Sequence, residues 1–209
     1  MPIAVLISGT GSNLQALIDA EAVNRLSATI RVVVSSKDTA LGVKRAQNAK
    51  IKTEIVRPSD YSTREEHDET LAKLLLRSSV EFVCLAGYTC IVGPRVLEAF
   101  PNRVLNIHPS LLPAFPGLNA PQQAMQFGVK ITGCTVHIVT DVVDGGPIVA
   151  QGAVPVLDGD TTEALAARIL AEEHRIYPQV VRWFCERRVH VNGRMVTIDR
   201  HPLDDEGDG

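Results

Sequence analysis

The first hundred residues alternate short apolar runs with segments of helical periodicity, and this alternation limits the folds open to the chain. The apolar runs predict strands at residues 3–8, 28–35, 53–56, 82–86 and 104–107. Helices are predicted between them at residues 13–25, at residues 43–49 and after the capping box Ser62-Thr63-Arg64-Glu65. Strands that alternate with helices form right-handed βαβ units. The sequence therefore predicts an α/β fold: a Rossmann-like, mostly parallel central sheet with flanking helices.

The second half of the chain has a different pattern. Long strands are predicted at residues 131–139 and 148–156, followed by a helix from the box Asp160-Thr161-Thr162-Glu163 to Cys185. Two short strands around Asn192-Gly193 predict a terminal hairpin, at residues 189–191 and 196–198. The acidic, glycine-rich tail after Pro202 is expected to be disordered. With 209 residues and no low-complexity linker, the chain is expected to form one compact domain with two halves.

Charge and cysteine content narrow the class of protein. The 21 basic and 24 acidic residues give a net charge of −3, which argues against a nucleic-acid partner. The apolar run at residues 3–7 is too short for a membrane span and is interpreted as a first strand, not a signal peptide. Four cysteines without a C-x-x-C pair are expected to be buried free thiols in a reducing compartment, the cytoplasm.

A glycine-rich turn, Ser8-Gly9-Thr10-Gly11-Ser12-Asn13-Leu14, joins the first strand to the first helix. Here the backbone can approach a ligand closely, and the helix, with Ser12 as its expected N-cap, presents free N–H groups to an anion. Leu14 occupies the place of the third glycine of a dinucleotide fingerprint, and no Walker A lysine follows. The loop therefore indicates a single phosphate; a plain tight turn is the alternative.

Asn106 and His108 stand at the carboxyl end of a predicted strand, where open α/β sheets bind their ligands. Residues two apart on a strand point to the same face. An amide donor can hold a carbonyl oxygen as it becomes negative, and an imidazole can transfer a proton near neutral pH. The pair therefore suits chemistry at a carbonyl; purely structural roles are the alternative.

Three other polar segments have both structural and functional interpretations. The turn Asp141-Val142-Val143-Asp144-Gly145-Gly146-Pro147 could place a carboxylate against His108 and hold the ring protonated. His137 is expected to be a hydrogen-bonded interior histidine, and Glu172-Glu173-His174 a solvated helix face. No nucleophile signature occurs, and the six histidines show no metal-ligand spacing, so we expect no metal and direct attack of one substrate on another.

Three motifs together resemble the phosphoribosylglycinamide formyltransferases, folate-dependent formyltransferases of purine biosynthesis. They are Gly9-Thr10-Gly11-Ser12-Asn13-Leu14, Asn106-Ile107-His108-Pro109-Ser110-Leu111-Leu112-Pro113 and Asp144-Gly145-Gly146-Pro147, and the similarity runs over residues 2–186. The resemblance implies the formyltransferase fold and transfer of a formyl group from 10-formyltetrahydrofolate to the glycinamide amine. It implies a ribonucleotide (phosphate)-binding half at 1–100 and a catalytic and folate-binding half at 101–209, with no metal. These small molecules are the expected partners of a monomer or homodimer.

The same resemblance assigns roles to individual residues. His108 would donate a proton, Asn106 would steady the formyl oxygen, and Asp144 would raise the basicity of His108. Gly11, Ser12 and Asn13 would hold the phosphate, and Glu173 would contact the glycinamide. The folate side would comprise Arg64 at the glutamate end, the pterin-pocket residues Thr89, Cys90, Ile91 and Val92, Asn106 again, and the stretch Thr140, Asp141, Val142, Val143 and Asp144.

Two departures from the family and two alternatives accompany this interpretation. The family usually has Met-Arg where this chain has Thr89-Cys90, and often His where Pro121 stands. A formyltetrahydrofolate hydrolase is one alternative, but that family carries an N-terminal regulatory domain and His-His-Ser in place of His108-Pro109-Ser110. A non-catalytic nucleotide-binding module is the other, and it leaves Asn106, His108 and Asp144 without a joint purpose.

Overall fold

A computed structural model describes residues 1–199, so the tail predicted after Pro202 lies outside the described residues. The main sheet has seven strands in the order β3-β2-β1-β4-β5-β6-β7. Their bounds are β1 Pro2–Ile7, β2 Thr29–Ser35, β3 Thr53–Ile55, β4 Phe82–Leu85, β5 Val104–His108, β6 Ile131–Ile138 and β7 Ile148–Pro155. β1 to β5 are parallel, and β6 is antiparallel to both its neighbours. This confirms the α/β fold and the mostly parallel sheet.

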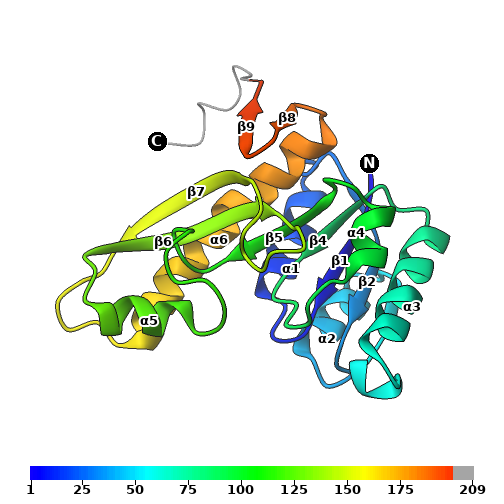
Figure 1. Cartoon of the computed structure of the whole chain (residues 1–209), viewed down its shortest axis with the longest axis horizontal. Coiled ribbons are helices and arrows are strands. Elements are labelled where there is room, and N and C mark those ends of the chain that lie inside the picture. The colour runs from blue at the N-terminus through cyan, green and yellow to red at the C-terminus, as the bar shows by residue number, and fades with distance from the viewer. Residues whose placement is uncertain (200–209) are drawn as a thin grey trace.

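Helices cover both faces of the sheet (Figure 1). Their bounds are α1 Ser12–Ala22, α2 Leu41–Asn48, α3 Arg64–Arg77, α4 Pro94–Ala99, α5 Ala120–Phe127 and α6 Thr162–Cys185, with a 3-10 turn at Pro58–Asp60. α1, α2 and α6 pack on one face, and α3 and α4 on the other. Within β1, Ile3, Val5 and Ile7 face the first group while Ala4 and Leu6 face the second. A strand covered on both faces reads as a continuous apolar run, because both sets of side chains are buried.

The strand order reverses between β1 and β4, and this reversal determines where a ligand can bind. From β1 the chain moves outward to β2 and β3, then returns to add β4 and β5 on the other side. Loops that leave neighbouring strands in opposite directions open a crevice at their carboxyl ends. Ser8, Ser36 and Thr89 follow β1, β2 and β4 there: Ser8 Oγ lies 2.6 Å from Ser36 Oγ and accepts from the Thr89 amide at 2.9 Å.

The helix starts differ from their predicted positions by one residue. Thr63, not Ser62, caps α3, because its hydroxyl accepts from the Glu66 amide. Thr161 likewise caps α6, while Asp160 forms a two-fold ion pair with Arg168. In each box two residues that can cap a helix are adjacent, so the sequence alone does not decide which of them is the N-cap.

Two helices and one turn were not predicted correctly. α4 has only six residues, too few to show periodicity, and α5 begins at a left-handed Asn119 followed by Pro121. The terminal hairpin was predicted correctly, as β8 Val189–Asn192 and β9 Met195–Ile198, but its turn is Gly193-Arg194. All four cysteines are free; Cys84 and Cys134 are buried, whereas Cys90 and Cys185 are only half-buried, contrary to prediction. Within residues 1–199 no helix is long and apolar enough to cross a membrane.

Candidate active site

Asn106 and His108 lie at the carboxyl end of β5 with their side chains on one face, as the spacing predicted. β5 pairs with antiparallel β6 so that Asn106 stands opposite His137 and His108 opposite Thr135. The partner strand therefore supplies polar neighbours to both residues. His108 is buried, with 5% of its surface exposed, and Asn106 is half-buried.

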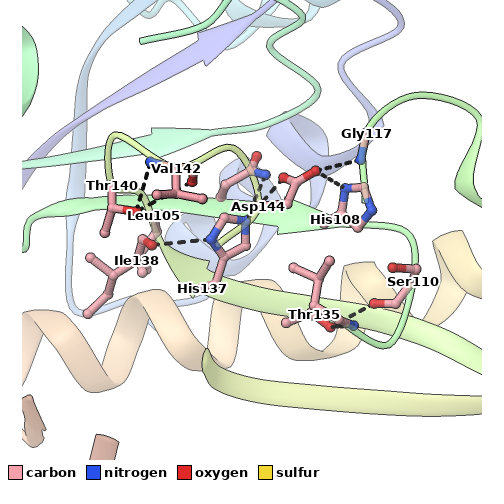
Figure 2. A network of polar contacts seen from close by, with 12 residues as sticks. Leu105, His108, Ser110, Gly117, Thr135, His137, Ile138, Thr140, Val142 and Asp144 are labelled. Atoms are coloured by element: carbon pink, nitrogen blue, oxygen red, sulfur yellow. Dashed lines mark hydrogen bonds and ion pairs between the residues drawn. The ribbon is translucent and has the colours of Figure 1, made fainter. Parts of the chain in front are cut away.

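Asp144 reaches this pair from the loop between β6 and β7 (Figure 2). One carboxylate oxygen, Oδ2, lies 3.5 Å from His108 Nδ1 and accepts from the Gly117 amide at 2.8 Å. The other, Oδ1, lies 3.6 Å from His137 Nε2. A protonated His137 ring, which can donate to the carboxylate, the Gly117 amide and the charge of a protonated His108 lower the pKa of Asp144, although partial burial opposes them. The structure thus brings Asn106, His108 and Asp144 together around an ionised carboxylate.

The contacts of His137 fix the orientation of the Asn106 amide. His137 Nδ1 lies 3.2 Å from the carbonyl of Ile138, which can only accept, so Nδ1 carries the proton in the neutral ring. Nε2 then accepts from Asn106 Nδ2 at 3.1 Å, a shorter distance than that to Asp144. This arrangement leaves the second Nδ2 hydrogen of Asn106 available for another acceptor. His137 is 2% exposed, which confirms an interior, hydrogen-bonded histidine.

The second ring nitrogen of His108 is held by the loop that follows β5. Nε2 lies 2.9 Å from the carbonyl of Phe115. Both ring nitrogens therefore face acceptors, which the doubly protonated ring satisfies fully. Thr135 of β6 anchors this loop: its hydroxyl donates to the Ser110 carbonyl at 2.6 Å and accepts from the Leu112 amide at 3.0 Å (Figure 2). These supporting residues were not predicted, because only the strand pairing identifies them.

The glycine-rich loop follows β1 at the same edge of the sheet. Gly11, not Ser12 as predicted, occupies the N-cap position of α1 in a left-handed conformation with φ 70°. A side chain there would also meet α2, since a Cβ on Gly11 would lie 2.5 Å from the Gly42 Cα. The first amides of a helix have no partner within the helix, so those of Ser12 and Asn13 remain available to an anion.

Asn13 connects this loop to α6. Its Nδ2 donates to Glu173 Oε2 at 2.7 Å, across 160 residues of sequence, and both side chains are buried. The prediction of a solvated face at Glu172-Glu173-His174 is therefore wrong for Glu173, which faces the sheet, while its neighbours are half-buried. Burial raises the pKa of Glu173 to about 7, although the hydrogen bond from Asn13 opposes the shift.

The raised pKa of Glu173 gives a test in the protein alone. A carboxyl whose folded pKa lies above its unfolded value favours folding at low pH, and this contribution is lost as the pH rises toward 7. We therefore expect the unfolding free energy of the native chain, relative to Glu173→Gln, to fall by about 3 kcal/mol between pH 4.5 and 8, at about 1.4 kcal/mol per pKa unit. Urea unfolding of both proteins at several pH values measures the difference. A difference that does not change with pH would contradict a buried, titrating Glu173.

The residues expected on the folate side occupy two loops and one helix end. Thr89, Cys90, Ile91 and Val92 follow β4; Thr89 and Ile91 are exposed, Cys90 is half-buried, and Val92 packs in the core. The turn after them is held by a residue that was not predicted. Asp68 of α3 accepts from the Gly93 and Arg95 amides at 2.8 and 2.7 Å. Arg64 is exposed at the first position of α3.

Thr140 to Asp144 lie between β6, the neighbour of β5, and β7. Val142 and Val143 are 60% and 56% exposed, which is unusual for apolar side chains beside a buried polar network. Thr140 is half-buried, and Asp141 is exposed. Within the described residues 1–199, no group of three or more His, Cys, Asp or Glu side chains could hold a metal ion.

Comparison with known proteins assigns the family. The model of the family described as "Formyl transferase" matches residues 1–181, most of the chain. The chain belongs to the formyl transferase family. The amide, the imidazole and the carboxylate that converge here are groups suited to chemistry at a carbonyl.

Members of this family with assigned names are similar over nearly the whole chain. Phosphoribosylglycinamide formyltransferase of Escherichia coli (strain K12) is 42% identical over 207 residues, covering 99% of this chain and 98% of that protein. The human trifunctional purine biosynthetic protein adenosine-3 is 43% identical over 198 residues, 94% of this chain and 20% of that protein. The crystal structure of glycinamide ribonucleotide transformylase 1 from Symbiobacterium toebii, 52% identical, superposes with a TM-score of 0.93 and covers 95% and 93% of the two chains. The formyltransferase fold is thereby confirmed.

Proposed function

We propose that this formyl transferase moves the formyl group of 10-formyltetrahydrofolate to the amine of phosphoribosylglycinamide, giving formylglycinamide ribonucleotide and tetrahydrofolate in purine biosynthesis. The observation that carries the proposal is the convergence of Asn106, His108 and Asp144 at one edge of the sheet. It occurs in a chain similar over nearly its full length to proteins named for this reaction. The relatives' names point to the substrates, and the geometry supports the roles proposed below.

The phosphate end of the ribonucleotide is assigned to Gly11, Ser12 and Asn13. Their backbone lies at the positive end of the α1 dipole, which attracts an anion. Glu173 would face the glycinamide, because its hydrogen bond to Asn13 places it directly behind this loop. Among the described residues 1–199 the buried atom Asn13 Oδ1 has no hydrogen-bond partner, which fits a donor group supplied by a substrate. Residues 1–100 would thus form the ribonucleotide-binding half.

The folate is assigned to the other side of His108. The exposed apolar side chains of Ile91, Val142 and Val143 fit a flat ring system, because covering them removes apolar surface from water. Arg64, exposed on α3, would face the negatively charged glutamate end. Residues 101–209 would carry the catalytic groups and the Thr140–Asp144 part of the pocket, while Arg64 and residues 89–92 come from the first half.

The reaction would proceed by direct attack. The amine nitrogen forms a bond to the formyl carbon, and the negative charge on the formyl oxygen is stabilised by Asn106 Nδ2 and by His108. A proton leaves the amine nitrogen and one reaches the folate nitrogen, through His108 or an ordered water, as the bond from that nitrogen to carbon breaks. Asp144, 3.5 Å from His108 Nδ1, would stabilise positive charge on the ring while the ring carries the proton.

His108 must exchange one contact before it can act on a substrate. Its Nε2 lies 2.9 Å from the Phe115 carbonyl and its Nδ1 faces Asp144. The Phe115 carbonyl is the partner that a substrate atom would replace, because Asp144 would stabilise positive charge on the ring.

Folate absorbance with and without the ribonucleotide tests the proposal. Tetrahydrofolate should be released only when phosphoribosylglycinamide is present, with formylglycinamide ribonucleotide formed in equal amount. Release without the amine would instead establish the hydrolase alternative. If tetrahydrofolate is released in neither case, the alternative of a non-catalytic nucleotide-binding module is supported.

The phosphate loop can be tested by Gly11→Ala. The new Cβ would strain a left-handed backbone and press against Gly42, so the loop must move. We expect the KM for the ribonucleotide to rise at least about tenfold, equivalent to ~1.4 kcal/mol of lost binding, with little change in the KM for folate. Gly159→Ala is the matched control: it has the same left-handed strain, with no atom within 4 Å of the new Cβ. Equal changes in the KM for both substrates would contradict the assignment of the phosphate to this loop.

Two further parts of the proposal concern the cellular location and the oligomeric state of the protein. A cytoplasmic location is supported by the four free thiols, which suit a reducing compartment. The protein would act as a monomer or homodimer on small-molecule substrates alone.

A further inference from the structure

The β8–β9 hairpin, which lies beyond the family match at residues 1–181, is fixed firmly to the end of α6 (Figure 1). Arg188 at its base is buried, and its guanidinium donates to the Asp199 carbonyl and to Glu186 Oε2. One face of the hairpin packs on the main core through Val189, Val191, Val196 and Ile198. The hairpin therefore has its own anchor, independent of its tip.

The tip of the hairpin contacts the loop that carries Asp144. Arg194 is the second residue of the two-residue turn, and its Nη1 donates to the carbonyl of Gly145 at 2.8 Å. The two residues are 49 positions apart in sequence. β9 also packs against β7, the strand that this loop enters. The contact thus connects the C-terminal hairpin to the residue directly after the catalytic carboxylate.

The Asp144 turn is strained and tightly closed. Asp144 has a φ of 51°, a left-handed conformation that is unfavourable for a residue with a Cβ. The turn is closed by the Gly145 amide, which donates to Val142, and by the Ile138 amide, which donates to Pro147. Gly145 itself is the most permissive residue type, so its carbonyl can rotate unless something holds it. Arg194 holds that carbonyl.

We propose that Arg194 is a positioning residue for the reaction: by binding the Gly145 carbonyl it holds the Asp144 turn in the conformation that places the carboxylate against His108. This inference rests on the proposed function, since it concerns the same Asp144. It assigns a role to the hairpin, whose tip acts on the folate side of the site and not on the phosphate side.

The position of Arg194 separates this role from a contribution to stability. Its side chain is exposed, whereas the hairpin is held by Arg188 and by its apolar face. Removing Arg194 should therefore leave the melting temperature nearly unchanged. The effect should concentrate in the turn from Thr140 to Pro147, which contributes both the catalytic carboxylate and the exposed valines assigned to folate.

Steady-state kinetics of Arg194→Ala give the first measurement. We expect kcat/KM for 10-formyltetrahydrofolate to fall about three- to tenfold, the range for one hydrogen bond, while the KM for the ribonucleotide stays within about twofold. Arg194→Lys, which keeps a cationic donor, should recover most of the loss. Arg187→Ala removes an exposed arginine at the foot of the same hairpin and should have no effect.

Amide hydrogen exchange of the free protein gives a second measurement that does not depend on activity. Exchange in the segment 138–148 should be faster in Arg194→Ala than in the native chain, with the glycine-rich loop at residues 8–14 unchanged. Unchanged exchange in 138–148, an equal loss for both substrates, or the same loss in Arg187→Ala would each overturn the proposal. If the chain transfers no formyl group at all, the exchange result still decides whether Arg194 holds the turn.

Discussion

Replacing His108 by alanine is expected to lower kcat by about 10²–10⁴-fold, the range for losing general acid–base assistance. The side chain is buried beside an ionised carboxylate, so water cannot easily take its place as the proton donor. The KM for the ribonucleotide should change little, because the phosphate loop lies on a different strand end. Single-turnover rates with both substrates saturating measure the effect. A kcat within about fivefold of the native value would contradict a role of His108 in proton transfer.

The same experiment extends to Asp144, which acts through His108. Asp144→Asn removes the negative charge 3.5 Å from Nδ1, so positive charge that develops on the ring during proton transfer is less stabilised. The kcat of this variant should therefore fall. Because the two residues act on one transition state, His108→Ala/Asp144→Asn should be scarcely slower than His108→Ala. Additive losses would mean that the carboxylate acts independently of His108.

The central features of this site could be predicted because they depend on local spacing. Continuous apolar runs predict strands buried on both faces, and the carboxyl ends of such strands meet at one edge. Asn106 and His108 stand two residues apart at one strand end, and the register with β6 confirms that their side chains share a face. The turn after β1 was likewise predicted from its glycines, and Gly11 has the left-handed conformation that glycine adopts readily.

The contacts that support the site could not be predicted in this way. Gly42 against Gly11, Glu173 against Asn13 and Phe115 against His108 join elements whose proximity depends on the packing of helices and loops. Glu173 illustrates the limit well, since in sequence it lies in a charged stretch typical of a solvated surface. Only the close packing of α6 on the sheet shows that this carboxyl is buried.

Asn106→Ala is the other substitution with a large expected effect, a fall in kcat of about 10²–10³-fold, the range for one oxyanion donor. The structure gives a specific reason. Asn106 Nδ2 donates one hydrogen to His137 Nε2, and this bond fixes the amide so that the second hydrogen is left for another acceptor. Asn106→Asp should be at least as slow, because it places a negative charge where the formyl oxygen becomes negative. Rapid-quench measurement of one turnover checks both variants.

A matched variant of the partner shows whether orientation is the cause. His137→Phe keeps most of the buried ring volume but removes the acceptor, so the Asn106 amide can rotate. We expect about a tenfold fall in kcat, the ~1.4 kcal/mol of one hydrogen bond. The double variant Asn106→Ala/His137→Phe should then be little slower than Asn106→Ala, because His137 has no amide left to orient. If the two losses multiply, His137 contributes to catalysis by a route that does not pass through Asn106.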